Sequence, residues 1–300
     1  MDREVLQQVA QERRHKFFPG ITLAEGIATS TDLESSLKDR DLVSMAVPSQ
    51  VMRLVARQVA EYIPRHTVVV NTAKGLDKGS LCRMSEVLYQ ELGYMERITV
   101  MSGPSFASEL ARNLPTAVTV AGYTRSAIEV VKNAYHYDCM RIYTSSDIVG
   151  VELGGIFKNV FALATGIVDG CNMGNNARAA LLTRGLAEMS RLVVALGGQE
   201  VTMQGLSGMG DMVLTATGDL SRNRTVGLRL GAGESLDQIM ATMEQVAEGV
   251  YTTHSGVALA EENGVDVPIM KATAAVLEGK LSVRQAMARL LSRAPKKERG

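Results

Sequence analysis

Val151-Glu-Leu-Gly-Gly-Ile-Phe-Lys158-Asn159-Val-Phe-Ala-Leu-Ala-Thr-Gly166 is the most informative stretch of this sequence. It is rich in Leu, Val, Phe and Ala and apolar on most faces, which favours a buried helix. A glycine costs about 1 kcal/mol against alanine inside a helix, and a buried ammonium costs more unless it is paired. The two glycines and Lys158 therefore predict close approach of a backbone or a ligand, with Lys158 directed at it. The alternative is a lysine at the helix edge whose amine reaches water.

The overall composition restricts the class of protein. Three hundred residues, 46% hydrophobic and 21% charged, suit one large or two ordinary globular domains. Lys plus Arg and Asp plus Glu number 32 each, so no overall field points to nucleic acid or to an acidic membrane surface. No apolar run of about 18 residues is free of charge, so no membrane span is expected.

The cysteines and histidines carry no recognisable site. Cys82, Cys139 and Cys171 are far apart and odd in number, which predicts neither a disulfide framework nor a metal site. A reducing cytoplasm is the expected location. The four histidines lack metal-ligand spacing, and the first residues do not read as a signal peptide.

The first half of the chain alternates short apolar runs with helical segments. The predicted strands are 41–49 (a run closed by Pro48), 67–72, 98–101, 116–121 and 140–143. Capping-box patterns at Thr31/Glu34 and Ser126/Glu129 predict two helix starts. This alternation predicts a parallel α/β sheet with right-handed crossovers, and residues 1–146 are assigned to a dinucleotide-binding domain.

In the second half the strand pattern disappears. The predicted helices are 147–166, 176–197, 222–230, 235–248, 251–263, 268–278 and 282–293. Capping boxes at Ser235/Gln238 and Ser282/Gln285 support two of these starts. Residues 147–300 are therefore predicted to form an all-helical substrate and catalytic domain, with the stretch containing Lys158 as its first helix.

Three polar turns follow predicted strands, at Pro48-Ser49, Lys74-Gly75 and Gly103-Pro104-Ser105. Ligands of parallel α/β sheets bind beyond the carboxyl ends of the strands, so these turns are candidate binding elements. Gly103-Pro104-Ser105 also opens a helix, where free backbone N–H groups attract anions. Ordinary turn formation and a proline-initiated helix explain the same residues equally well.

Two further motifs lie in the helical half. Gly205-Leu-Ser-Gly-Met-Gly210-Asp211 has no preceding strand, so it is interpreted as a bend close to the helix of Lys158 and not as a nucleotide loop. Asp211 is the expected partner of Lys158. Ser221-Arg222-Asn223-Arg224 stands where a helix should begin, and arginine offers a planar set of donors for phosphate. The alternative is a solvated arginine pair beside a capping serine.

The motifs together resemble the bacterial NAD(P)-dependent glycerol-3-phosphate dehydrogenase family over nearly the whole chain. The residues that carry the resemblance are Val47-Pro-Ser49, Thr72-Ala-Lys-Gly-Leu76, Ser102-Gly-Pro-Ser-Phe-Ala107, Val151-x-Leu-Gly-Gly-x-x-Lys-Asn159, Thr183-Arg-Gly-Leu-Ala-Glu-Met-Ser190, Gly208-x-Gly-Asp211, Ser221-Arg-Asn-Arg224 and Val246-x-Glu-Gly249. The order and spacing of these motifs make the resemblance specific.

The resemblance implies reversible hydride transfer between NAD(P)H and dihydroxyacetone phosphate, which gives sn-glycerol 3-phosphate for phospholipid synthesis. It implies that Lys158 accepts the proton in oxidation and donates it in reduction. The implied substrate-binding residues are Lys74, Gly103, Ser105, Asp211, Ser221, Arg222 and Asn223. The implied cofactor-binding residues are Lys74, Ala107, Arg222, Val246 and Glu248. The resemblance also implies a small phosphorylated substrate. No metal is expected. The sequence does not decide the oligomeric state, and a homodimer is the state to test.

A base that works near neutrality requires a lysine pKa well below the usual value of about 10.4. Burial in an apolar helix and a second ammonium at Lys74 both lower the pKa of Lys158. Asp211 raises it while orienting the amine. The balance between these effects is left open by the sequence.

The sequence departs from the family in one respect. The family begins with a strand, a G-x-G-x-x-G turn, a helix and a second strand, and no such segment is present here. We therefore expect an incomplete, N-terminally truncated doubly wound sheet and weak or absent turnover by the chain as given. Met1 is then either an internal start or the start of a fragment, or the chain is a natural non-catalytic form that binds a phosphate ester. A related dehydrogenase of another small hydroxy acid is a further alternative.

Overall fold

The computed structural model describes residues 3–16, 18, 20–243, 247–295 and 297–298. The chain forms two compact units. The first comprises residues 1–73, 84–101 and 105–146, and the second comprises 74–83, 102–104 and 147–300. Residues 147–300 lie in the second unit, and two short segments that follow strands of the sheet also belong to it.

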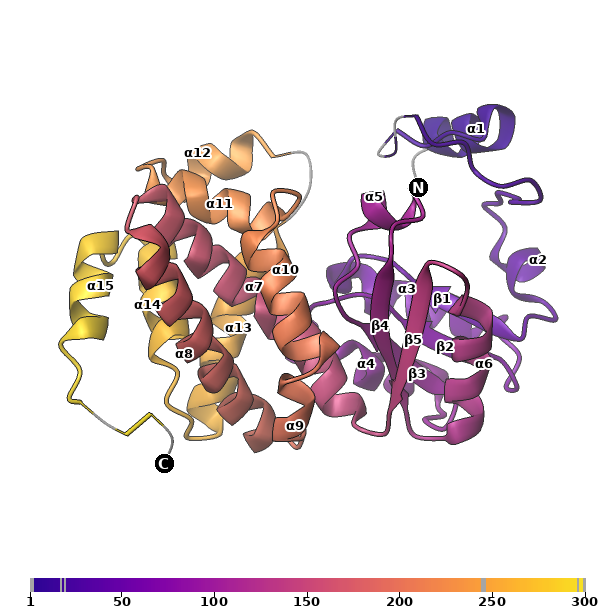
Figure 1. Ribbon diagram of the computed structural model, residues 1–300. Coiled ribbons are helices and arrows are strands. Elements are labelled where there is room, and N and C mark those ends of the chain that lie inside the picture. The colour runs from indigo at the N-terminus through magenta and orange to yellow at the C-terminus, as the bar shows by residue number, and fades with distance from the viewer. Residues whose placement is uncertain (1–2, 17, 19, 244–246, 296, 299–300) are drawn as a thin grey trace. The chain divides into compact units, whose positions relative to one another are not determined.

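The first unit is built on a five-stranded sheet (Figure 1) with the order β1-β2-β3-β4-β5. The strands are β1 Leu42–Met45, β2 Val68–Asn71, β3 Ile98–Ser102, β4 Thr116–Gly122 and β5 Met140–Ser145. The helices around them are α1 Arg3–Glu12, α2 Leu33–Leu37, α3 Met52–Ala60, α4 Met84–Leu92, α5 Ala107–Leu110 and α6 Arg125–Tyr135, with a 3₁₀ turn at Ser49–Val51. All five strands lie where the sequence predicted them.

Valine and isoleucine side chains fill the core of this unit. Val68, Val70, Val118 and Val120 are at most 1% exposed and pack with Val131 of α6. The interior strand β2 is buried at every position, as a near-continuous apolar run requires. The α/β class predicted from the sequence is therefore confirmed.

One strand pair departs from the expected parallel arrangement. The pairs β1/β2, β2/β3 and β4/β5 are parallel. Gly122 at the end of β4, however, lies against Ile98 and Thr99 at the start of β3, and Thr124 Oγ1 donates to Glu96 O at 2.7 Å. The two strands therefore run in opposite directions. The connection between them contains only the four-residue α5, whereas a parallel crossover usually needs a longer helix.

Two of the four predicted capping boxes are confirmed and two are corrected. Ser235 and Ser282 form complete boxes with Gln238 and Gln285 at the starts of α12 and α15. The helix predicted to start at Ser126 is capped by Thr124, which accepts from Ala127 N, and α2 is capped by Asp32 in place of Thr31. In both corrected helices a nearby side-chain oxygen reaches the free N–H groups first.

From residue 147 on, the described part of the second unit is built from helices (Figure 1). Its helices are α7 Ile148–Gly170, α8 Gly174–Ala195, α9 Glu200–Met203, a π-helical turn Leu206–Gly210, α10 Asp211–Thr217, α11 Arg222–Gly231, α12 Leu236–Ala241, α13 Glu248–Glu262, α14 Pro268–Leu277 and α15 Val283–Leu291. The predicted bend at 205–211 is this π-helical turn, and α9 and α10 were not predicted. Part of the predicted helix 235–248 falls on residues 244–246, outside the described residues.

Helix α7 is the centre of the second unit, with α8, α10, α11 and α13 packed around it (Figure 1). Nearly every residue from Ile148 to Val168 is buried. Among the described residues it is the one helix long and apolar enough to cross a membrane, yet 94% of its apolar window is buried inside the protein. This burial is that of a core helix.

Glycines set the contact between α7 and α11. A Cβ added to Gly166 or Gly170 would overlap backbone atoms of α11, and one added to Gly227 or Gly231 would overlap backbone atoms of α7. The two backbones therefore touch without intervening side chains. This close packing fixes the N-terminal end of α11, which carries Arg222 and Asn223, along α7.

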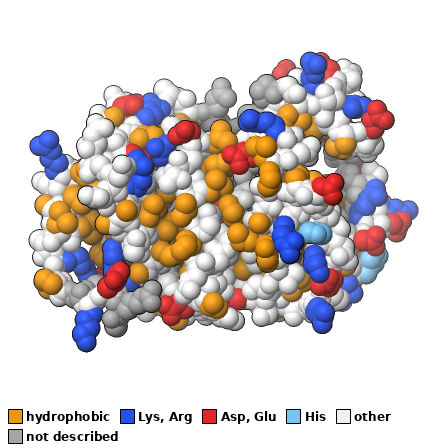
Figure 2. Space-filling view, in the orientation of Figure 1, with side chains coloured by type: hydrophobic (Ala, Val, Ile, Leu, Met, Phe, Trp, Pro, Cys, Tyr) orange, Lys and Arg blue, Asp and Glu red, His pale blue; other side chains and the backbone are white. Residues whose placement is uncertain are grey.

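On the face shown in Figure 2, neither positive nor negative side chains dominate the surface. Figure 2 shows basic and acidic side chains intermixed over that face, as 32 residues of each sign would suggest. This is the surface expected from the balanced composition.

Candidate active site

Lys158 lies in the middle of α7, and its side chain is only 8% exposed. Asp147 starts this helix as its N-cap and accepts from Gly150 N at 2.8 Å. A Cβ on Gly154 would lie 2.7 Å from Ser207 O, and one on Gly155 would overlap Ser102 Oγ. The two glycines therefore admit other chain segments against α7, which is the close backbone approach predicted from the sequence.

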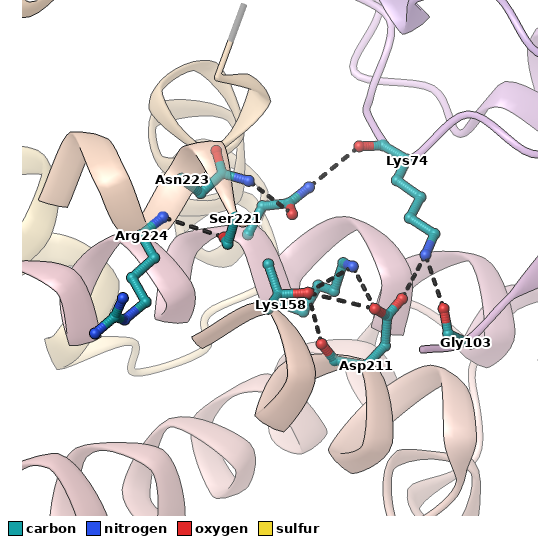
Figure 3. A network of polar contacts seen from close by, with 9 residues as sticks. Lys74, Gly103, Lys158, Asp211, Ser221, Asn223 and Arg224 are labelled. Carbon is teal, nitrogen blue, oxygen red and sulfur yellow. Dashed lines mark hydrogen bonds and ion pairs between the residues drawn. The ribbon is translucent and has the colours of Figure 1, made fainter. Parts of the chain in front are cut away.

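Asp211 is the partner of the Lys158 ammonium. Asp211 follows the π-helical turn and is the first residue of α10. Its side chain is only 1% exposed. Lys158 Nζ donates to Asp211 Oδ1 and, at 2.8 Å, to Thr215 Oγ1 (Figure 3). Thr215 in turn donates to Asp211 O at 2.7 Å, one helical turn back. Two of the amine's three protons are thus directed at oxygen acceptors on α10.

A second ammonium shares the same carboxylate. Lys74 Nζ donates to Asp211 Oδ2 at 2.5 Å and to Gly103 O at 3.1 Å (Figure 3). Gly103 has φ +144°, a conformation that L side chains rarely adopt, so glycine is needed to turn this carbonyl toward the lysine. One carboxylate therefore bridges two lysines from segments 84 residues apart along the chain.

A chain of amides lies beside the two lysines. Asn223 Nδ2 donates to Asn159 Oδ1 at 2.9 Å, and Asn159 Nδ2 donates to Lys74 O at 3.4 Å (Figure 3). Asn223 Oδ1 accepts from Gly249 N at 2.8 Å. The starts of α11 and α13 are thus tied to α7 directly beside Lys158.

The Ser221-Arg222-Asn223 motif forms the start of α11, as predicted. Ser221 is its N-cap and accepts from Arg224 N at 3.2 Å, and Arg222 is the first helical residue. The N-terminal N–H groups and the positive helix end favour an anion here. Arg224 instead pairs with Asp169 and Asp219, which assigns it a structural role.

The pKa of Lys158 is lowered from 10.5 to about 7. Burial is the largest cause, because it disfavours the charged amine, and the nearby Lys74 ammonium acts in the same direction. Asp211 opposes both through its charge and its hydrogen bond. Burial prevails, which decides the balance that the sequence left open.

The remaining predicted residues are placed as follows. Ser105 and Ala107 belong to the first unit, between β3 and the start of α5. Glu248 is the first residue of α13, next to the Gly249 amide that Asn223 binds. Val246 lies outside the described residues. Thr215 and Asn159 were not among the site residues predicted from the sequence. Asn159 did give a signal, because an asparagine inside an apolar helix is costly.

An α/β unit followed by a helical unit with a buried, readily deprotonated lysine fits the class of nicotinamide-dependent dehydrogenases. Two family models match this chain. The NAD-dependent glycerol-3-phosphate dehydrogenase N-terminus matches residues 1–128, and the corresponding C-terminus matches residues 147–288. The chain belongs to the NAD-dependent glycerol-3-phosphate dehydrogenase family.

Individual relatives give the same result. The chain is 45% identical to glycerol-3-phosphate dehydrogenase [NAD(P)+] of Syntrophotalea carbinolica, over 99% of this chain and 90% of that protein. It is 47% identical to the Geobacter metallireducens protein of the same name, over 95% of this chain and 85% of the relative. The crystal structure of glycerol-3-phosphate dehydrogenase from Coxiella burnetii superposes with a TM-score of 0.92 at 38% identity, covering 97% and 90% of the two chains.

The N-terminal family match begins at residue 1, so the predicted truncation of the first domain is not borne out. The sequence nevertheless contains no G-x-G-x-x-G, the loop that seats a pyrophosphate at a helix start. Around Lys74 the structure does suit a polar ligand. Ser102 Oγ is buried beside it and has no hydrogen-bond partner among the described residues. The residues around Lys74 therefore fit the nicotinamide ring of NAD or NADP and the substrate beside it.

Proposed function

We propose that this chain catalyses the reversible, NAD(P)-dependent conversion of dihydroxyacetone phosphate to sn-glycerol 3-phosphate. The curated relatives carry the name of this activity. The observation that carries the proposal is the buried Lys158 amine, held by Asp211 and Thr215 and flanked by Lys74. When bound, the cofactor accepts or supplies the hydride.

Lys158 is the proton-transfer group in this proposal. With a pKa of about 7, its neutral amine accepts the proton of the C2 hydroxyl during oxidation of glycerol 3-phosphate. Its ammonium returns a proton to the carbonyl oxygen during reduction. Asp211 and Thr215 orient the amine, because each accepts one of its protons. Burial of the site limits access of water to the reacting atoms.

The other site residues hold the substrate and the cofactor. Gly103 and Ser105 follow β3, and Asp211 and Lys74 provide charged groups beside Lys158. The phosphate is bound at the start of α11, where Ser221, Arg222 and Asn223 combine an arginine with helix-terminal N–H groups. The residues proposed to hold the cofactor are Lys74, Ala107, Arg222, Val246 and Glu248.

The proposal extends to the setting of the enzyme. The three cysteines are free, as expected in a reducing cytoplasm. The product serves phospholipid synthesis in this assignment. Size-exclusion chromatography with light scattering tests whether the chain forms a homodimer.

Replacement of Lys158 by methionine tests the proposed role. Methionine keeps most of the side-chain length without the amine, so the fold is expected to persist. Loss of a general base lowers turnover by at least about 100-fold. NAD(P)H oxidation with dihydroxyacetone phosphate is followed by absorbance, and circular dichroism verifies folding. A loss of only a few-fold would reject the role of Lys158.

A substrate panel tests the substrate class. If the start of α11 binds a phosphate, dihydroxyacetone and other hydroxy-acid precursors without a phosphate are poor substrates. Equal turnover of phosphorylated and unphosphorylated compounds would instead favour a related dehydrogenase.

A further inference from the structure

Lys74 is carried by a short folded segment, residues 74–83, that belongs to the helical unit. Leu76 and Arg83 form an antiparallel bridge within it. Asp77 N donates to Cys82 O at 2.9 Å, and Leu81 N donates to Asp77 O at 3.0 Å. The segment is therefore a closed loop, with Lys74 at one end and Arg83 at the other.

The Arg83 end of the loop is joined to α7 by a buried ion pair. Arg83 Nη1 lies 3.0 Å from Glu152 Oε2, and the two side chains are 12% and 2% exposed. Glu152 stands six residues before Lys158 on the same helix. A carboxylate buried to this degree needs a cation, because desolvation of an unpaired charge is costly. The pair therefore fixes the end of the loop at a defined place on α7.

The Lys74 end is joined to the same helix, one residue after Lys158. Asn159 Nδ2 donates to Lys74 O at 3.4 Å, a long bond that holds the loop only weakly on its own. Leu76, between the two ends, is fully buried in the core formed with Leu153, Ile156 and Phe157. The ion pair of Arg83, the burial of Leu76 and the contacts of Lys74 with Asn159, Asp211 and Gly103 thus attach the loop to the rest of the helical unit.

We propose that Arg83 and Glu152 are positioning residues, whose ion pair holds the 74–83 loop on α7 and so keeps the Lys74 ammonium between Asp211 and Gly103 O. The inference rests on the proposed function, in which Lys158 exchanges the proton. Neither Arg83 nor Glu152 contacts the Lys158 amine itself. They act through Lys74, whose Nζ lies 2.5 Å from Asp211 Oδ2.

The position of Lys74 matters because its charge acts on Lys158. The groups that face the Lys158 amine are Asp211 and Thr215 on α10 and Lys74 on the loop. The Lys74 ammonium lowers the pKa of Lys158, whereas Asp211 raises it. If the loop moves away, Lys74 no longer pairs with Asp211, and Lys158 keeps that carboxylate as its own ion-pair partner. The pKa of Lys158 then rises, and less neutral amine is present near pH 7.

A double variant, Arg83→Met with Glu152→Leu, tests the inference. It removes both charges and replaces them with apolar groups, which avoids leaving a buried charge unpaired. The expected results are a fall in kcat/KM for glycerol 3-phosphate oxidation of about tenfold or more near neutral pH and an upward shift of the acidic limb of the pH profile by about one unit. Arg83→Lys keeps the charge but loses the second donor group, so it should shift the limb by a smaller amount and serves if the double variant fails to fold.

Arg178→Met is the matched control. Arg178 pairs with Asp169 at the other end of α7 at 2.7 Å, so its loss tests whether removing any ion pair on this helix has the same effect. We expect lower stability and an unchanged pH profile. An equal shift in this control would overturn the inference, as would a folded double variant whose acidic limb does not move.

The pKa of Lys158 is also measured directly, in an experiment that does not depend on turnover. Protein labelled with 13C-lysine is titrated by NMR, and the Lys158 Cε signal is assigned by its absence in Lys158→Met. A raised pKa in the double variant supports the positioning role even if Lys158→Met keeps full turnover, a result that would reject only the proposed function. An unchanged pKa rejects the positioning role whatever the kinetics show.

Discussion

Lys158 and Lys74 share a single carboxylate, but burial is what sets the acidity of Lys158. The Lys158 side chain is 8% exposed and that of Lys74 is 22% exposed. Since burial penalises the charged form, the deeper amine has its pKa lowered to about 7. A fully solvated lysine would remain protonated at that pH. Its depth within α7 therefore makes Lys158 suitable as a base.

Asp211→Asn tests the opposing effect of the carboxylate at this scale. The substitution removes the charge that raises the pKa of Lys158, so this pKa falls further below its ordinary value. In the proposed mechanism, oxidation of glycerol 3-phosphate requires the neutral Lys158 amine. The acidic limb of its pH profile should therefore move to lower pH, together with a lower maximal rate because the amine loses its main orienting contact.

Asp219→Asn is the control, since Asp219 lies near the same site in sequence but its side chain is 95% exposed and pairs with Arg224. Its profile should match that of the parent chain. An acidic limb that stays in place or moves upward in Asp211→Asn would contradict the assignment of this limb to Lys158.

The sequence predicted some of these contacts and could not predict others. Lys158 in an apolar helix required an anion, and Asp211 after a glycine-rich stretch was a reasonable partner. Thr215 gave no signal, since a threonine in a helix commonly bonds its own backbone, as it does here with Asp211 O. Arg83 and Glu152 lie 69 residues apart, and nothing local to either marks the other as its partner.

Helices α7 and α11 show how glycine spacing sets a contact between elements. Gly166 and Gly170 face Gly227 and Gly231, and each pair is spaced by four residues, so all four lie on the facing sides of the two helices. Backbone contact of this kind admits no side chain. The direction of α11, and with it the place of Arg222 and Asn223, depends on these positions.

Gly227→Ala tests this contact. The added methyl group would overlap Leu163 O and lie 2.8 Å from Gly166 Cα and Ile167 N, so the helices must separate. Overpacking of this kind typically lowers the free energy of unfolding by about 1–3 kcal/mol. The midpoint of urea denaturation should fall, and KM for the phosphorylated substrate should rise because the start of α11 moves.

Gly79→Ala provides the comparison, since a Cβ there meets nothing within 4 Å. Its free energy of unfolding should stay within about 0.5 kcal/mol of the parent value. If Gly227→Ala behaved in the same way, the close contact between α7 and α11 would not be a determinant of stability.

At the level of elements, periodicity located the strands and most of the long helices. It did not find α9 or α10, and it predicted a bend where the π-helical turn lies. These lie in a glycine-rich region where local propensity favours a bend, and packing against α7 imposes helix instead. The caps of α2 and α6 were misplaced because Asp32 and Thr124 compete with the serine and threonine of the predicted boxes.

For the whole molecule, the α/β class and the helical second half followed from the alternation of patterns. The reversed direction of β4 did not, since it depends on how the segment between β3 and β4 turns and not on any periodicity. The assignment of 74–83 and 102–104 to the helical unit was equally hidden. Both segments follow strands of the sheet, and only their tertiary contacts with α7 assign them to the helical unit.

The burial of α7 also has a consequence for motion. A helix enclosed from Ile148 to Val168 has no route to local opening, so its amide hydrogens should exchange with solvent only when the whole helical unit unfolds. The 74–83 loop, whose residues 78–80 are exposed, should exchange sooner. The amine proposed to exchange the proton thus belongs to the slowest part of the unit, while the lysine that adjusts its acidity belongs to a faster one. Fluctuations of the loop alone would then change the acidity of Lys158 without moving it.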